Sequence, residues 1–444
     1  MIQIYHSDAD VLLERRDIAA SNSGFSALTR IEIREDVRRQ TLLGFGAAMT
    51  DSACCVLANA KEALRREVYQ RLFSREGLGL NMARISVAAS DYSRDCFSCD
   101  DVPEDVEMKH FSVAHDEEYV FPVLRDLLSC RPDLYLLSSA WSPPGWMKTG
   151  GEMTGSWMRE KYIEAYAEYY FRFLKSYADH GIRISALTPQ NETETDQVSR
   201  MPACFLHPEY EMKFAAVLRS KLEAAGMNPE IWIVDHNYIH WNRARWMLDC
   251  PECKKAVQGV AFHYYEGNAR MLDYLHRLHP DMSFHVTEGG PDLSENYEEL
   301  SCKFSVIITN ALNNWCRSFV TWNAVLDENG YPNIGPYSCA GLVTLDGRKG
   351  MARVSGHYKA LAHYSSFLDR GAVNVESRLM WRGQDAEGSD SFPIFHCAFE
   401  YRDGSLVAVL TNTGEKDEVM LRVRGYDYRI MLKAGSVCTV VVPR

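Results

Sequence analysis

The sequence predicts an α/β protein: a (β/α)8 TIM-type barrel with an adjoining β-sandwich that both termini form. Between residues 39 and 369, short apolar stretches alternate with helical patterns eight times, which is the count for such a barrel. Residues 1–38 and 370–444 contain short strand-like stretches and turn signals instead. Because neither flanking segment has enough strands to enclose a core alone, we expect the two to share one sandwich.

Length and composition agree with a large domain and a smaller companion. The chain has 444 residues, too many for one ordinary hydrophobic core, with 46% hydrophobic and 24% charged residues as in soluble globular proteins. Its net charge of −12 argues against a nucleic-acid partner, because phosphate binding requires a basic face.

The same composition bears on the compartment. Residues 1–10 lack the basic and then apolar order of a signal peptide, and no run of about 18 apolar residues predicts membrane insertion. Thirteen scattered cysteines, an odd count, are typical of reduced thiols rather than of a disulfide framework. We therefore expect a cytoplasmic protein, with the oligomeric state left open.

The individual elements follow from the hydrophobic pattern. Residues 2–5 and 27–33 alternate like half-exposed antiparallel strands. In the barrel region, Asp51 is a candidate helix cap, and aromatic residues of 163–177 recur at helical spacing. The predicted barrel strands are 42–45, 81–87, 134–137, 184–187, 231–234, 257–262, 284–287 and 319–322, and the predicted strands of the tail are 395–399, 406–411, 419–423, 428–432 and 437–442.

Two of the predicted barrel strands end in a glutamate. Glu192 follows strand four in Thr188-Pro189-Gln190-Asn191-Glu192, and Glu288 follows strand seven in His285-Val286-Thr287-Glu288. The C-terminal strand ends of such barrels carry the chemistry. Glycoside hydrolysis requires one carboxyl to protonate the leaving oxygen and a second to attack the anomeric carbon or to hold a water. Glu192 and Glu288 are therefore the candidate catalytic pair.

Aromatic and short polar side chains gather at the same strand ends. Sugar rings pack their C–H faces on aromatic planes, while sugar hydroxyls require polar partners. A core histidine satisfied by its neighbours explains His263 equally well, and packing alone explains some of the tryptophans. The residues concerned are Trp141 and Trp146 after strand three, His263, Tyr264 and Tyr265 after strand six, Trp322 after strand eight, and the polar Asp91, Asn191 and Asn323.

Several motifs occur in one order along most of the chain: residues 44–51 (Gly-Phe-Gly-Ala-Ala-Met-Thr-Asp), 141–149 (Trp-Ser-Pro-Pro-Gly-Trp-Met-Lys-Thr), Gln190-Asn191-Glu192, Thr287-Glu288, and Trp322-Asn323 followed by Pro332-Asn333. With these motifs the chain resembles glycoside hydrolase family 30, the family of the lysosomal glucosylceramidases, and is most similar to its bacterial members. The resemblance implies the same barrel and sandwich, a place in carbohydrate or sphingolipid metabolism, and hydrolysis of β-glycosides with net retention. We expect no cofactor and no metal.

Carried over residue by residue, the resemblance makes Glu192 the acid/base and Glu288 the nucleophile. Asn191 would hold the sugar 2-hydroxyl, and Tyr265 would hydrogen-bond the nucleophile. The expected substrate-binding residues are completed by Asp91, Trp141, His263, Trp322, Asn323 and Asn333. The chain departs from the family pattern at Thr193, Asp95, Phe97, Cys99 and Ile334, which bears on the sugar preference.

Three function classes fit the sequence. The first is a retaining glycosidase, exo-acting on a β-glucoside or a related small glycoside; β-xylosidase, β-fucosidase and β-1,6-glucanase are alternatives within the family. The second is a sugar-binding barrel without turnover, against which the presence of both carboxyls and Asn191 argues. The third is a zinc-dependent hydrolase, because Cys96-x-x-Cys99 and Cys250-x-x-Cys253 have zinc-ligand spacing, although about 150 residues separate them.

The pairing also predicts geometry and protonation. A retaining enzyme keeps its carboxyls about 5–5.5 Å apart, whereas an inverting one leaves about 6.5–9.5 Å for water. We predict the shorter separation. A negative Glu288 and partial desolvation would raise the pKa of Glu192 above its usual value of about 4.3, while Glu288 stays ionised.

Overall fold

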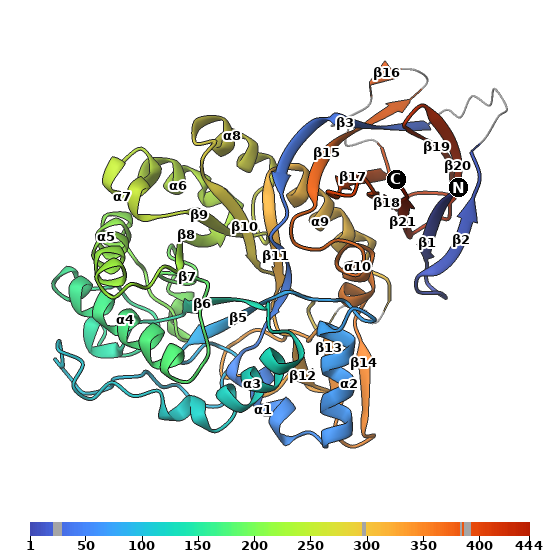
Figure 1. The fold of residues 1–444 in the computed structure, drawn as a ribbon. Helices are drawn as coiled ribbons and strands as arrows, with labels where there is room; N and C mark the ends of the chain where they lie inside the picture. Colours follow the sequence, from blue (N-terminus) through green and yellow to red (C-terminus); the bar gives the residue numbers. More distant parts are fainter. Residues whose placement is uncertain (21–28, 295–298, 382–383, 386–391) are drawn as a thin grey trace.

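The protein consists of a closed barrel with a separate sheet beside it (Figure 1). The structure is a computed structural model and describes residues 1–20, 29–294, 299–381, 384–385 and 392–444. Both termini lie in the sheet, on the right of the view, and helices α9 and α10 lie between the sheet and the barrel (Figure 1). The predicted fold class is confirmed.

Eight parallel strands close the barrel in the order β10-β11-β4-β5-β6-β7-β8-β9. Helices cover the outside, so most strand residues are buried on both faces, as in β10, where all six are buried. Each strand overlaps its predicted stretch and differs by a few residues at the ends. The strands are β4 Gly44–Ala48, β5 Met82–Val87, β6 Tyr135–Ala140, β7 Ala186–Thr188, β8 Glu230–Asn237, β9 Gly259–His263, β10 Ser283–Glu288 and β11 Cys316–Thr321.

The helices alternate with these strands. Helix α4 buries the predicted aromatic face. The first helix is capped by Thr50, whose hydroxyl accepts from the Ala53 amide, and not by Asp51, which is buried and accepts from the Arg94 amide. The helices are α1 Asp51–Asn59, α2 Glu62–Phe73, α3 Val120–Cys130, α4 Ile163–Asp179, α5 Pro208–Ala224, α6 Trp241–Leu248, α7 Pro251–Ala256, α8 Arg270–Leu278, α9 Cys302–Asn313 and α10 Gly356–Ser365, with short 3-10 turns at Ala114–Glu117, Gly145–Met147, Glu160–Tyr162, Gln197–Ser199 and Tyr238–His240.

Both ends of the chain build the second sheet, as predicted. Its order is β2-β1-β21-β18-β17-β15-β3-β19-β20, with β16 beside β15. The sheet curls so that residues from its two halves, such as Ile4 and Ile430, share one apolar core. The strands are β1 Ile2–Ser7, β2 Glu14–Ile18, β3 Thr29–Thr41, β15 Val373–Trp381, β16 Gln384–Asp385, β17 Ile394–Glu400, β18 Leu406–Asn412, β19 Asp417–Val423, β20 Tyr426–Leu432 and β21 Ser436–Val442.

Some features of this sheet differ from the sequence prediction. Strands β2, β15 and β16 were not predicted, and β3 runs to Thr41, past residue 38. Residues 27 and 28 of the predicted strand 27–33 lie outside the described residues. The domain bounds 1–38, 39–369 and 370–444 stay a prediction.

A small third sheet, also not predicted, follows the last barrel strand. It consists of β12 Val325–Asp327, β13 Val343–Asp346 and β14 Met351–Val354. The connection between β12 and β13 packs on the loop after β5, where the amides of Ile334 and Gly335 both donate to the carbonyl of Asp91, at 2.8 and 3.2 Å. A Cβ on Gly335 would lie 2.5 Å from the Cβ of Asp91, so this close approach requires glycine.

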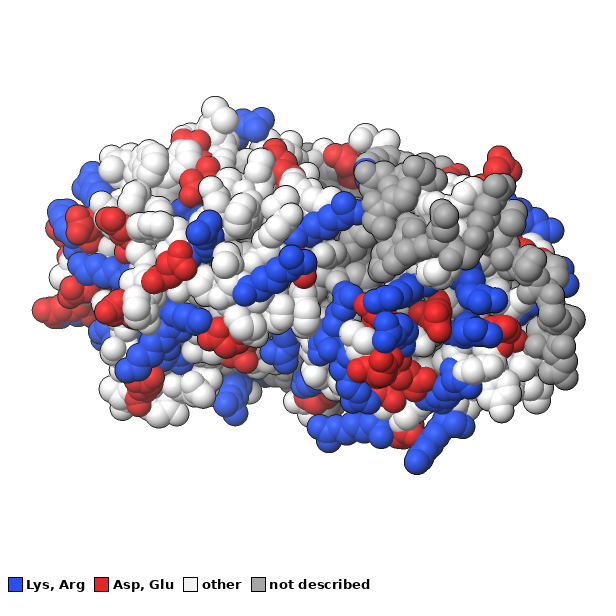
Figure 2. All heavy atoms as spheres, turned by 90° about the horizontal axis from the view of Figure 1, so that it is seen from above, with Lys and Arg blue, Asp and Glu red and all other residues white. Residues whose placement is uncertain are grey.

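Charged side chains of both signs are interspersed over the face shown in Figure 2, on the barrel part and on the sheet part. None of the helices in the described part of the chain combines the length and apolar composition needed to cross a bilayer.

Candidate active site

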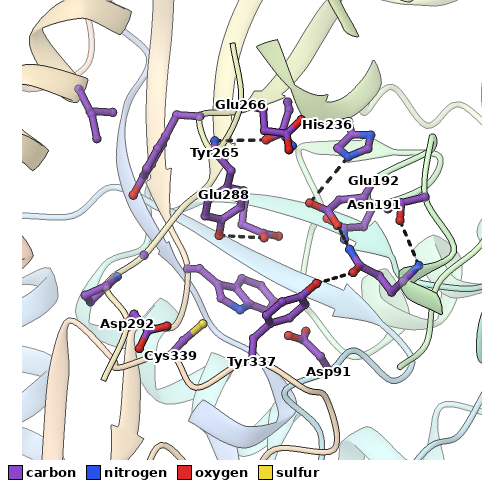
Figure 3. Close-up of a pocket in the computed structure, with 18 of the residues that line it drawn as sticks. Asp91, Asn191, Glu192, His236, Tyr265, Glu266, Glu288, Asp292, Tyr337 and Cys339 are labelled. Carbon is purple, nitrogen blue, oxygen red and sulfur yellow. Dashed lines mark hydrogen bonds and ion pairs between the residues drawn. The ribbon is translucent and has the colours of Figure 1, made fainter. Parts of the chain in front are cut away.

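A cavity of about 800 Å³ opens at the C-terminal ends of the barrel strands. Figure 3 shows the carboxyls of Glu192 and Glu288 facing this space, with Tyr265 beside Glu288 and Tyr337 across from them. The lining includes, of the residues predicted from the sequence, Asp91, Trp141, Asn191, Glu192, Tyr265, Glu288 and Trp322.

The two glutamates lie close together. Glu288 is the last residue of β10, and Glu192 lies four residues beyond β7. One carboxylate oxygen of each and one ring nitrogen of His263 lie within 4.8 Å of one another. The side chain of Glu192 is 12% exposed and that of Glu288 is 9% exposed. Both carboxyls are therefore largely withdrawn from water while they still face the cavity.

Arg84, on β5, lies fully buried under this pair. Its guanidinium donates to Glu288 Oε2 at 2.7 Å, to Asn191 Oδ1 at 2.8 Å and to Asp235 Oδ2 at 2.8 Å. It also lies 4.7 Å from the ring centroid of Trp141. The guanidinium of Arg84 thus holds the carboxylate of Glu288 and the side-chain amide of Asn191, the residue next to Glu192. It also contacts Trp141 in the cavity wall.

Asp235 completes this buried network. A register shift in β8 around Val234 and His236, with positive φ of 77° at Val234 and 47° at Asp235, accompanies the inward turn of the carboxylate. Its oxygens accept from Thr188 at 2.5 Å and from Thr287 at 2.6 Å. Burial acts to raise the pKa of Asp235, but the charge of Arg84 and the contact with His263 outweigh it and hold the pKa well below its usual value.

His263 lies beneath the pair, fully buried, and is not among the residues that line the cavity. Its Nδ1 is 3.3 Å from Glu192 Oε1, and its Nε2 is 3.2 Å from Asp235 Oδ1. Burial acts to lower the pKa of His263, but the negative charges of Glu288, Asp235 and Glu192 raise it to about 9. At neutral pH it is therefore an imidazolium between carboxylates.

This charge state predicts a pH-dependent stability. Because the pKa of His263 is raised above the unfolded value of about 6.5, its contribution is present at low pH and is lost as the pH rises through about 9. The free energy of unfolding that His263→Asn removes should be smaller at pH 10 than at pH 7 by about 2–3 kcal/mol. Denaturant unfolding at both pH values measures this.

His285 supplies the matched control. It is another fully buried barrel histidine, but burial lowers its pKa well below the usual value, so it carries no charge in this range. The cost of His285→Asn should therefore be the same at pH 7 and pH 10. Equal pH dependence of the two substitutions would contradict an imidazolium at His263.

The protonation order of the two glutamates differs from the sequence prediction. Burial acts to raise the pKa of Glu192, but His263, His236 and the side-chain amide of Gln197 stabilise the charged form, and the pKa is lowered. The pKa of Glu288 is raised by burial, with the charge of Glu192 adding to it, against His263 and Arg84. The sequence prediction weighed the charge of Glu288 and partial desolvation, without the histidines and the amide that surround Glu192.

Other predicted residues take their expected places. Tyr265 donates to Glu288 Oε1 at 3.2 Å, which is the contact that the resemblance implied. Trp141 and Trp322 stack with ring centroids 4.9 Å apart and form an aromatic floor. Asp91 is 4% exposed, and its Oδ1 has no hydrogen-bond partner among the described residues. Burial raises its pKa well above the usual value, with Glu288 and Glu192 adding to the effect.

Two predicted residues lie outside the cavity lining and instead build its loops. The Oδ1 atom of Asn323 accepts from the Thr50 hydroxyl at 3.1 Å, and Asn323 is fully buried with a φ of 51°. Asn333 donates to the carbonyl of Tyr337 at 2.6 Å and accepts from the amide of Gly335 at 2.7 Å.

Sequence reasoning missed several residues of the site. Arg84 and Asp235 had a signal, since each is a charged residue within or next to an apolar strand, where burial requires a partner. His236 follows the same strand and lines the cavity. Gln197 and Tyr337 come from two long loops and had no signal of periodicity or motif.

The CxxC pairs do not meet as a zinc site would require. All four cysteines are free, with Cys99 and Cys253 buried. Within the described ranges, the group of side chains close enough to share an ion is Glu192, His263 and Glu288.

A (β/α)8 barrel with two close carboxylates and an aromatic floor at the C-terminal strand ends defines a glycoside hydrolase. The comparison with family models agrees. The glycosyl hydrolase family 30 TIM-barrel domain matches residues 42–368, and the chain belongs to that family.

Its relatives have two kinds of names. The chain is 28% identical over 421 residues to putative glucosylceramidase 4 of Caenorhabditis elegans, covering 88% of this chain and 78% of that one. It is 28% identical over 427 residues to an endo-1,6-beta-D-glucanase of Neurospora crassa, covering 91% and 86%. The solved endo-beta1,6-glucanase BT3312 superimposes with a TM-score of 0.88 at 25% identity, over 100% of both chains.

Proposed function

We propose that this glycoside hydrolase cleaves β-glucosides with net retention, with Glu288 as the nucleophile and Glu192 as the acid/base. The observation that carries the proposal is that one carboxylate oxygen of Glu192 lies within 4.8 Å of one carboxylate oxygen of Glu288. An inverting enzyme separates its carboxyls by about 6.5–9.5 Å to hold a water between them. The shorter separation supports direct attack on the anomeric carbon.

The contacts around each carboxyl support this division of roles. Both oxygens of Glu288 are held, one by Arg84 and one by Tyr265, which orients the carboxylate and stabilises its charge for attack. Glu192 protonates the leaving oxygen, and after glycosylation removes the charge of Glu288 it takes a proton from the incoming water. The unpartnered oxygen of buried Asp91 suits a sugar hydroxyl.

The sugar and the leaving group follow from the relatives and the lining. The names of the relatives, glucosylceramidase and 1,6-beta-D-glucanase, support glucose in the subsite next to Glu288. The lining includes a set of polar side chains from the segments after β7, at the end of β8 and after β9, and polar groups match a hydroxyl-rich leaving group better than lipid chains. We therefore favour a β-1,6-linked glucose oligomer over a glycolipid, on the evidence of Glu194, Thr195, His236, Asn237, His240 and Glu266 in that set.

A substrate panel tests the proposal. Among nitrophenyl β-glycosides, the glucoside should be hydrolysed faster than the xyloside, fucoside and galactoside. A β-1,6-linked glucose trimer should be cleaved faster than glucosylceramide in detergent. Proton NMR of the first product should show the β-anomer. The α-anomer as the first product would contradict retention, and hydrolysis of none of these compounds would favour a sugar-binding barrel.

A further inference from the structure

Both oxygens of Glu192 have hydrogen-bond partners within the protein. Oε1 lies 3.3 Å from His263 Nδ1, and Oε2 accepts from the side-chain amide of Gln197 at 2.5 Å. An acid that gives its proton to a leaving group must present one oxygen to that group. Because each carboxyl oxygen has two lone pairs, a partner has to give way only where it lies on the cavity side, from which the leaving group approaches.

His263 is not the partner that can leave. It is fully buried and is held on its other nitrogen by Asp235 at 3.2 Å. Gln197, by contrast, is half-buried, lines the cavity and belongs to the long loop between β7 and α5. The oxygen that becomes free for substrate is therefore Oε2, the one under Gln197.

A second loop holds Gln197 in this position. Its side-chain oxygen accepts from the Tyr337 hydroxyl at 2.7 Å. The backbone of Tyr337 is fixed in turn, because its carbonyl accepts from Tyr92 at 2.9 Å and from Asn333 at 2.6 Å. Figure 3 shows Tyr337 reaching toward Glu192 across the cavity. The connection between β12 and β13 thus holds the neutral side-chain amide of Gln197 in hydrogen-bond contact with Glu192.

The backbone around Gln197 stores strain. Gln197, Val198 and Ser199 have φ values of 52°, 53° and 54°, a left-handed conformation that non-glycine residues adopt at a cost of about 1–3 kcal/mol each. Val198 is β-branched and 77% exposed, so its own packing does not enforce this conformation. Asp196 holds the turn locally, because its side chain accepts from the Val198 amide and its carbonyl from the Ser199 amide, both at 3.0 Å. The contacts of Gln197 with Glu192 and Tyr337 add to this, and a ligand can break them.

We propose that Gln197, braced by Tyr337, is a substrate-displaced latch on Glu192: its side-chain amide donates to Oε2 until the leaving-group side of the substrate pushes it aside. Gln197 is a positioning residue, and the inference rests on the proposed role of Glu192. While the amide of Gln197 is in place, it stabilises the carboxylate of Glu192. Once the amide is displaced, the pKa of Glu192 rises, which favours the protonated form that acid catalysis needs. Binding of a substrate whose leaving group displaces Gln197 is thus coupled to protonation of Glu192.

Several other groups also act on Glu192. Gln197→Met and Val198→Ala leave all of them in place, whereas Tyr337→Phe removes the hydroxyl of one. Two histidines favour its charged form, and the neighbouring acids oppose it. The titratable groups around it are His236 on β8, His263 on β9, Glu288 on β10, Asp91 after β5, and the more distant His240, Tyr265 and Tyr337.

The test substitutes Gln197→Met, which keeps the length of the side chain but removes the donor. Loss of a donor to a carboxylate raises its pKa, so the basic limb of the pH profile of kcat/KM should move up by roughly half a pH unit or more for an aryl β-glucoside with a poor leaving group. With a dinitrophenyl glucoside, whose leaving group needs no proton, the rates of Gln197→Met above the pH optimum should match those of the wild type.

Two further variants accompany this test. Tyr337→Phe should also move the basic limb to higher pH, but by less. Val198→Ala changes the same turn without a contact to Glu192, and it should leave both pH profiles unchanged.

A second readout does not depend on turnover. Carbon-13 NMR of labelled glutamate, with Glu192 assigned through Glu192→Gln, should show the pKa of Glu192 rising in Gln197→Met. An unchanged pKa and an unchanged basic limb would overturn the latch and leave the retaining mechanism standing. Failure of the wild-type protein to hydrolyse any glycoside would instead overturn the proposed function, while the NMR titration would still decide whether Gln197 controls Glu192.

Discussion

Replacement of Glu288 by glutamine is expected to abolish formation of a glycosyl-enzyme on every β-glucoside. The amide cannot attack the anomeric carbon, although it keeps the shape of the side chain and a contact with Tyr265. Removal of a nucleophile typically costs a factor on the order of 10⁵–10⁶ in kcat. Burst kinetics with a dinitrophenyl glucoside, and mass spectrometry of protein trapped with a 2-fluoro glucoside, should both detect the intermediate in the wild type and not in Glu288→Gln.

The same experiment with Glu192→Ala separates the two roles. A dinitrophenolate leaves without a proton, so the first step should survive and the intermediate should accumulate, because no base remains to activate water. Azide should rescue the second step and give the β-glucosyl azide. If both variants lose the burst equally and azide rescues neither, the assigned roles are wrong.

The meeting of Glu192 and Glu288 was predictable because it follows from topology. Both residues come at the C-terminal end of a parallel barrel strand, and those ends share one rim whatever the loops do. The same logic placed Trp141 and Trp322 on that rim, where the structure stacks them. The eight strands themselves were predictable because strands buried on both faces appear as uninterrupted apolar stretches.

Protonation was not predictable in the same way. It depends on which neighbours touch each carboxyl. His263 was expected at this rim as a substrate-binding residue and Gln197 was not expected at all, yet both favour the charge on Glu192. The contact between Gln197 and Tyr337 joins two loops 140 residues apart, and it depends on a left-handed turn that lacks glycine. Asn333 shows the same limit, since it was expected at the sugar and braces Tyr337 instead.

Arg84, like Asp235, is an exception among the missed residues, because its strand context carried a usable signal. A guanidinium within the apolar strand Met82–Val87 has to meet carboxylates or remain unpaired in a dry interior, which is prohibitively costly. In a barrel, its partners must come from other strands at the same height. The structure supplies Asp235 from β8 and Glu288 from β10.

Substitution of Arg84 should therefore damage stability and catalysis together. Arg84→Met leaves Asp235 and Glu288 as buried carboxylates without their cation, and loss of one partner from such a group typically costs about 3–5 kcal/mol. The charge of Arg84 also lowers the pKa of Glu288, so its removal should raise that pKa further and move the acid limb of kcat/KM to higher pH. Denaturant unfolding measures the first effect, and a pH profile with an activated glucoside measures the second.

Two further variants keep this prediction decisive. Arg172→Met removes an exposed arginine paired with Glu168 at 2.8 Å on helix α4. It should cost at most about 0.5 kcal/mol of stability and leave the acid limb unchanged.

Arg84→Lys restores a positive charge. The lysine cannot reach Glu288, Asn191 and Asp235 at once, since an ammonium lacks the planar fork of a guanidinium. It should recover much of the stability and return the acid limb toward its wild-type position, while kcat stays low because Glu288 and Asn191 are no longer held in register. A methionine variant as stable as the wild type, with an unmoved acid limb, would show that Arg84 neither neutralises the site nor holds the nucleophile in its ionised form.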